Sequence, residues 1–113
     1  DVNWMPGGRQ PIAVHFASGR IYVLMHMGEY WSEYEPAQEI WVLDANTHKL
    51  IGRHAVPDGL KDKLSNIAVS QDANPQVYAS DGAGNTYVLD AQTLQKIRSM
   101  DNSGGGILYT VGP

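Results

Sequence analysis

The chain has 113 residues, no cysteine and a formal charge of −4 at pH 7, from 12 acidic and 8 basic side chains. The absence of cysteine excludes disulfides, thiolate metal sites and cysteine nucleophiles. The Lys and Arg residues are scattered, which argues against nucleic-acid binding, because that function needs clustered basic side chains. No apolar run approaches the ~18 residues of a transmembrane helix, and the first residues do not resemble a signal sequence.

The first half of the chain is predicted to contain four short strands. Residues 1–10 are rich in Gly and Pro and are expected to form a loop. Two runs of β-branched, aromatic and aliphatic residues follow, and the Gly-containing turn 17–19 between them indicates a hairpin. Two more runs come after the segment 26–38, which contains Gly28 and Pro36. The predicted strands of this unit are 12–16, 20–25, 39–44 and 50–55.

The second half of the chain repeats this order. The clearest correspondence joins residues 39–47 to residues 85–93, where one polar residue and four strand-forming residues precede Asp-Ala-x-Thr. Trp41 therefore returns 46 positions later as Tyr87. We expect these two rings to superpose when the units are overlaid, and to pack within the sheets rather than to bind a ligand. The predicted strands of this unit are 66–70, 76–80, 86–90 and 95–99.

A repeat of roughly 40–50 residues indicates a β-propeller in which each unit is one antiparallel blade. The predicted fold class is therefore all-β, with two four-stranded blades and one strand of a third. The predicted boundaries are 1–58 for the first blade, with 26–38 as an insertion, 59–101 for the second and 102–113 for the final strand. Because closed propellers need about four to eight blades, and the chain begins at Asp1, we interpret it as a segment of a longer polypeptide. An excised pair of blades is expected to self-associate through its exposed apolar faces.

We assign no catalytic, cofactor-binding or metal-binding residue from the sequence. The four histidines lack the spacing of a local metal pair, and His15 is interpreted as a core or inter-blade histidine with a satisfied hydrogen bond. The Gly-rich run 103–106 lacks the Lys and the helix of a phosphate-binding loop and is interpreted as an inter-blade loop. Four carboxylates in and beside the insertion have no base or nucleophile of fixed geometry nearby and are interpreted as a solvated face. They are Glu29, Glu33, Glu35 and Glu39.

The insertion carries three large aromatic residues, Tyr30, Trp31 and Tyr34. Burying such a ring stabilises a protein by roughly 1.5–3 kcal/mol, so these rings are expected to cover apolar surface. Two alternatives are open: the rings fold back on Val23 and Trp41 of their own blade, or they contact a partner. The second unit joins its second and third strands with only a few residues. Folding of a blade therefore does not need a connection as long as 26–38. We therefore favour a partner-contacting loop.

Several runs of this sequence resemble the heavy (large) subunit of methylamine dehydrogenase. They are Ile67–Pro75 followed by Tyr78-Ala79, Val88–Thr93, Ile97–Asp101, and the charged aromatic insertion before Glu39–Asp44. The resemblance covers most of residues 20–111 and corresponds to the C-terminal end of that subunit. It implies that the chain is part of a seven-bladed propeller.

The resemblance also implies a function. In that family two large subunits join two small subunits, which carry the tryptophan tryptophylquinone cofactor and the catalytic aspartates. The periplasmic complex oxidises primary amines to aldehyde and ammonia and passes electrons to a blue-copper protein. The large subunit is mainly a scaffold, so the resemblance assigns no catalytic residue to this chain. Two other hypotheses remain open: an independent propeller-type binding module without enzymatic activity, and a propeller hydrolase or lactonase with a central metal, for which the ligands are lacking.

Overall fold

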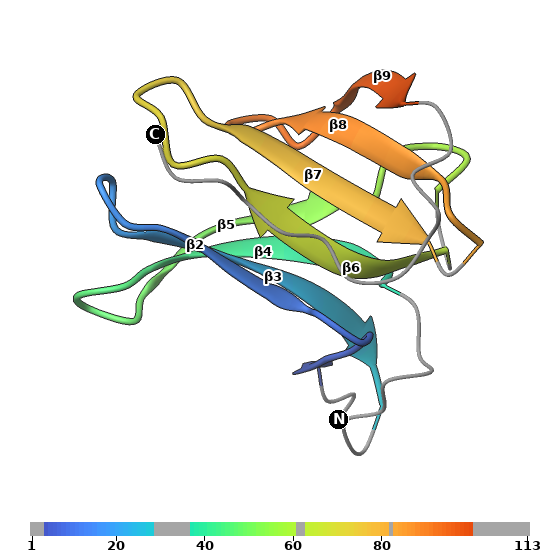
Figure 1. The fold of residues 1–113 in the computed structure, drawn as a ribbon. Helices are drawn as coiled ribbons and strands as arrows, with labels where there is room; N and C mark the ends of the chain where they lie inside the picture. The colour runs from blue at the N-terminus through green and yellow to red at the C-terminus, as the bar shows by residue number, and fades with distance from the viewer. Residues whose placement is uncertain (1–3, 29–36, 61–62, 82, 101–113) are drawn as a thin grey trace.

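The computed structural model describes residues 4–28, 37–60, 63–81 and 83–100, which form two antiparallel sheets packed against each other (Figure 1). The first sheet contains β1 (Trp4–Pro6), β2 (Ile12–His15), β3 (Arg20–Met27), β4 (Glu39–Asp44) and β5 (Leu50–Ala55). The second sheet contains β6 (Leu64–Val69), β7 (Gln76–Asp81), β8 (Thr86–Asp90) and β9 (Lys96–Met100). The all-β prediction and all eight predicted strands are confirmed. The described residues include no helix that could cross a membrane.

The N-terminal segment differs from its prediction as a loop. β1 pairs antiparallel with the far end of β3, with Met5 opposite His26. β2 pairs with the first half of the same β3 edge, so β1 and β2 share one neighbour. The prediction was wrong here because local composition does not show that β3 extends beyond β2 to Met27 and leaves an edge to be paired. The predicted final strand in 102–113 lies outside the described residues.

The two sheets repeat one another in register as well as in sequence. Trp41 lies opposite Val23 and Arg53, and Tyr87 lies opposite Ala79 and Ser99 at the corresponding positions. Each sheet also has an irregularity at the same place, after Val42 in β4 and after Val88 in β8. The equivalence of the two rings, predicted from the sequence, is confirmed by this register.

The Asp-Ala-x-Thr turns have the same hydrogen bonds in both units. Asp44 Oδ1 accepts from the N–H groups of Asn46 and Thr47, at 2.8 and 2.9 Å. Asp90 Oδ1 accepts from Gln92 and Thr93 at 2.8 and 2.9 Å. These amide contacts lower the pKa of both carboxyl groups below the ordinary value for Asp.

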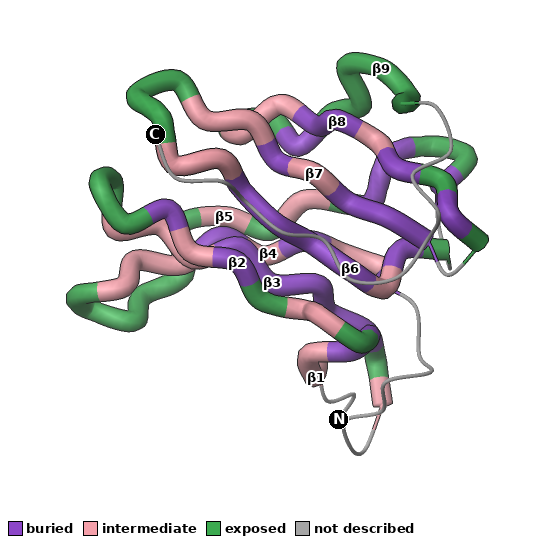
Figure 2. Tube along the Cα trace, in the orientation of Figure 1, coloured by how far each residue is buried: buried purple, intermediate pink, exposed green. Residues whose placement is uncertain are grey.

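The core lies between the two sheets, and strand alternation decides which residues enter it. Figure 2 shows buried stretches along β3, β6, β7 and β8, whereas β9 is exposed. Each large aliphatic side chain buried in this layer contributes roughly 1.5–3 kcal/mol to stability. On the first sheet the core face is formed by Tyr22, Leu24, Ile40 and Val42. On the second it is formed mainly by Ile67, Val69, Val77, Ala79 and Leu89, with Tyr87 packed against it.

The innermost strands of the two sheets are joined directly through Gln10 and β6. Gln10 donates its N–H to the Ser65 carbonyl at 3.1 Å and accepts from the N–H of Ile67 at 2.9 Å, in a parallel bridge. A Cβ added to Gly8 would come within 2.4 Å of the Ser65 oxygen. This contact between backbones therefore requires glycine at position 8. We call the contact between residues 8–16 and β6 the inner seam.

Replacing Gly8 by Ala is expected to destabilise the protein strongly. Gly8 has a φ of +116°, and side chains in this backbone region cost on the order of 1–3 kcal/mol even before the overlap with Ser65 is added. Gly59→Ala is the matched control, because Gly59 has a φ of +85° but nothing within 4 Å of the added Cβ. Denaturant unfolding of the full-length protein should show a clearly larger loss for Gly8→Ala. Equal losses would contradict the inner seam.

Asp81 is expected to make stability depend on pH. Burial by itself raises the pKa of this carboxyl group, but hydrogen bonds from the Asn85 side chain and from backbone N–H groups of the turn outweigh it and lower the pKa. A lowered pKa means that the stabilisation is present above the ordinary Asp pKa of about 3.9 and is lost as the pH falls through the folded-state value. The stability difference between wild type and Asp81→Asn, measured by urea unfolding, should shrink below about pH 4. A difference that does not change with pH would refute this role.

Candidate functional site

The sequence-predicted contact residues Tyr30, Trp31 and Tyr34 lie outside the described residues, so their role stays a prediction. The structure describes the residues on either side of them. β3 ends at Met27, and the chain returns at Ala37, which is buried and donates its N–H to the Leu64 carbonyl at 2.9 Å. The connection from β3 to β4 thus ends beside Leu64, the first residue of β6. It starts two residues later than the sequence predicted, because His26 lies within β3.

His15 lies at the inner seam. Its side chain is 3% exposed, with Nε2 at 2.9 Å from the Asp72 carbonyl and Nδ1 at 2.7 Å from the Ser18 hydroxyl. Because a carbonyl only accepts, Nε2 carries the hydrogen and Nδ1 is the acceptor, which also receives the Ser18 N–H at 3.3 Å. The prediction of a satisfied inter-blade histidine is confirmed. Both ring nitrogens are used, so this histidine holds two loops together.

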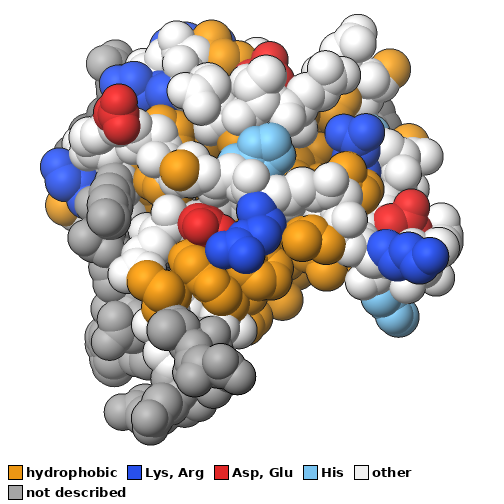
Figure 3. Space-filling view, turned by 180° about the vertical axis from the view of Figure 1, so that it is seen from behind, with side chains coloured by type: hydrophobic (Ala, Val, Ile, Leu, Met, Phe, Trp, Pro, Cys, Tyr) orange, Lys and Arg blue, Asp and Glu red, His pale blue; other side chains and the backbone are white. Residues whose placement is uncertain are grey.

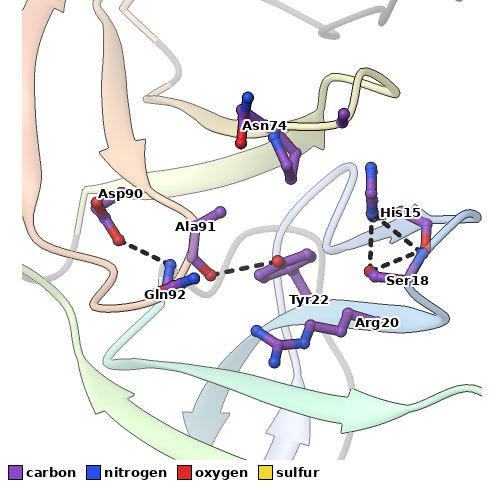
Figure 4. Close-up of a pocket in the computed structure, with 10 residues that line it drawn as sticks. His15, Ser18, Arg20, Tyr22, Asn74, Asp90, Ala91 and Gln92 are labelled. Atoms are coloured by element: carbon purple, nitrogen blue, oxygen red, sulfur yellow. Dashed lines mark hydrogen bonds between the residues drawn. The ribbon is translucent and has the colours of Figure 1, made fainter.

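A groove runs along the outer end of the joint between the sheets, where the β2–β3, β6–β7 and β8–β9 turns meet (Figure 4). One hollow of about 560 Å³ is lined by residues from all three turns, and a second of about 420 Å³ adjoins β5. Arg20, Ala91 and Gln92 line both hollows, so the two adjoin each other. We call the two hollows together the seam groove.

Tyr22 forms the floor of the seam groove. Its ring is 1% exposed, and its hydroxyl donates to the Ala91 carbonyl of the second sheet at 3.2 Å. Burial raises the pKa of Tyr22 above its ordinary value, although the positive charge of the neighbouring Arg20 opposes this shift. The phenol is therefore neutral at physiological pH and fixes the β8–β9 turn against β3.

Three polar side chains on the groove wall have unused hydrogen-bonding groups. Within the described residues, the Asn74 and Gln92 amides make no side-chain hydrogen bond, and Arg20 forms no ion pair. Figure 4 shows Arg20 and Tyr22 on one side of the hollow and Asn74 on the other. Arg20 was not predicted from the sequence as a site residue. Arg20 lies next to a strand-forming Tyr and pairs with Asp44 across the sheet. This position does not indicate that three turns meet around the Arg20 side chain.

The face of the first sheet turned away from the core carries a second cluster. The Trp4 and Trp41 rings lie 5.7 Å apart between centroids, and the Arg53 guanidinium lies 4.9 and 4.7 Å from the two centroids. Glu39 accepts from both Trp41 Nε1 and Arg53 Nε at 2.8 Å. Figure 3 shows acidic and basic side chains beside hydrophobic ones on the face seen from behind. Glu39, interpreted as part of a solvated face, is therefore bonded within this cluster.

In the described part of the chain, the titratable groups do not converge on a reacting centre. No three His, Asp or Glu side chains there lie close enough to hold a metal ion. His26 is buried with Nδ1 at 3.2 Å from the Met27 carbonyl, and its Nε2 has no hydrogen-bond partner among the described residues.

Comparison with known proteins identifies relatives over nearly the whole chain. The family model of the methylamine dehydrogenase heavy chain matches residues 1–111. Methylamine dehydrogenase heavy chains from Methylorubrum extorquens and Paracoccus versutus are each 36% identical to it, over 91% and 92% of this chain. The chain spans only 24% of the length of each of these relatives.

A solved structure also has a similar fold. Hydrazine synthase from Kuenenia stuttgartiensis matches with a TM-score of 0.54 at 21% identity, over 79% of this chain and 22% of that one. At this identity the match supports the propeller-type fold alone. The family match and the relatives, however, extend over both sheets and the seam between them, and so the chain belongs to the methylamine dehydrogenase heavy chain family.

Proposed function

We propose that this chain is a scaffold segment of the large subunit of a quinone-dependent amine dehydrogenase. The complex would oxidise primary amines to aldehyde and ammonia and pass the electrons to a blue-copper protein. The observation that carries the proposal is the family match over residues 1–111, together with a structure whose described polar residues mainly join strands and turns. His15 and Tyr22, the two buried groups with reactive side chains at the joint, both hold one sheet to the other.

The quinone of such an enzyme is formed from two joined tryptophans, so the Trp4–Trp41 pair must be tested against it. The two rings are tilted by 45° and share Arg53, and the Trp41 N–H donates to Glu39. These contacts occupy the ring faces and the indole nitrogen with partners from the same sheet. The Trp4–Trp41 pair therefore does not fit the cofactor, which we expect in the small subunit.

The proposed partners follow from the same family membership. They are a small subunit that carries tryptophan tryptophylquinone, a second large subunit in an α2β2 complex, and the blue-copper acceptor, all in the periplasm. The acidic character of the chain, with a net charge of −4, affects the orientation and rate of such encounters more than their affinity.

The large subunit containing this chain should not oxidise amines by itself. Purified without the small subunit, it is expected to give no reduction of a redox dye with methylamine above a denatured control. The same preparation mixed with the small subunit should reduce the dye. Activity of the large subunit alone would overturn the scaffold role, and failure of the two subunits to associate would favour the independent binding module.

The insertion residues give a second test. Replacing Tyr30, Trp31 and Tyr34 by Ser in the full-length subunit should weaken assembly with the partner subunits by at least about tenfold, because aromatic anchors dominate interface energies. The melting temperature of the free subunit should stay unchanged. Phe16→Ser is the matched control, since this ring is 78% exposed in the β2–β3 turn; it should leave assembly intact. A large loss of stability with normal assembly would show that the rings pack on their own blade.

A further inference from the structure

We propose that the seam groove binds a small organic acid with a single carboxylate and a short apolar arm. The described residues that line the groove come from the two sheets and from the turns between their strands. The inference is independent of the proposed scaffold role.

The donors on the groove wall match a carboxylate. Arg20 presents a planar guanidinium, which binds carboxylates through paired N–H groups. Within the described residues its side chain forms no ion pair. The side-chain amides of Asn74 and Gln92 line the same hollow without a hydrogen-bond partner in the described structure. The guanidinium and the two amides thus offer N–H donors on different walls of the hollow.

The charges around the groove limit the ligand to one negative charge. Asp90 is the carboxylate on the wall, and its Oδ1 is already bound by the N–H groups of Gln92 and Thr93. A dianion would meet this carboxylate as well as Arg20. Two other titratable groups line the first hollow: Tyr22 is neutral, and both ring nitrogens of His15 are hydrogen-bonded. His54 lines the second hollow.

The second hollow provides the apolar surface. It is lined by Val42, Ile51 and Gly52 beside Arg20, and Ile51 is 50% exposed. An alkyl chain extending from a carboxylate at Arg20 would cover part of the Ile51 side chain. Removal of this apolar surface from water favours binding in proportion to the area covered. A straight chain of about six carbons is short enough for the two adjoining hollows, since pockets of ≈ 300–1,000 Å³ hold ligands of this size and larger.

The test uses the full-length large subunit and three probes of equal length: hexanoate, hexanedioate and 1-hexanol. Titration calorimetry is expected to show that hexanoate binds at least about tenfold more tightly than either of the others, the ratio that corresponds to ~1.4 kcal/mol. Arg20→Gln should reduce hexanoate binding to the level of 1-hexanol. Arg98→Gln removes an exposed arginine from β9, outside the groove, and should leave binding unchanged.

A second variant covers the case in which Arg20→Gln fails to fold. Asn74 is exposed in the β6–β7 turn, so Asn74→Asp should fold normally and, by adding a negative charge, weaken hexanoate binding several-fold. Hexanoate binding that is equal to that of 1-hexanol, or that is insensitive to both Arg20→Gln and Asn74→Asp, overturns the proposal.

Discussion

The structure depends on the close approach of two backbones at the inner seam. Gln10 both donates to and accepts from β6, and Gly8 lies where any side chain would overlap the Ser65 carbonyl. Because this contact fixes the inner edges of the two sheets, it also fixes which faces meet. The core then contains Leu24 and Ile40 of one sheet and Ile67 and Leu89 of the other. The seam is therefore the constraint from which the packing of both sheets follows.

The same constraint places the polar features of the chain. At one end of the joint, Tyr22 of the first sheet reaches the Ala91 carbonyl of the second, and the turns around this contact leave the seam groove between them. On the opposite face, Trp41 packs on Trp4 and Arg53. Tyr87, its counterpart, packs against the core. Among the described residues, these equivalent rings thus have different neighbours: Tyr87 faces the first sheet, whereas Trp41 faces Trp4 and Arg53.

Much of the fold could be predicted from the sequence because it repeats. The Asp-Ala-x-Thr turns that follow Trp41 and Tyr87 carry local information, since each Asp binds the two amides just after it. β1 could not be predicted, because its strand conformation comes from pairing with the distant end of β3. Arg20 and Asn74 were missed for a related reason. They belong to separate turns, and only the packing of one sheet on the other brings them to the same groove.

Hydrogen exchange at the inner seam tests the central claim most directly. In the full-length protein, the amide hydrogens of Gln10 and Ile67 should be protected as strongly as those within β7, since each donates across the joint between the sheets. Exchange of both amides at the rate of an exposed turn, with β7 still protected, would show that the two sheets are not joined in this way and would contradict the account.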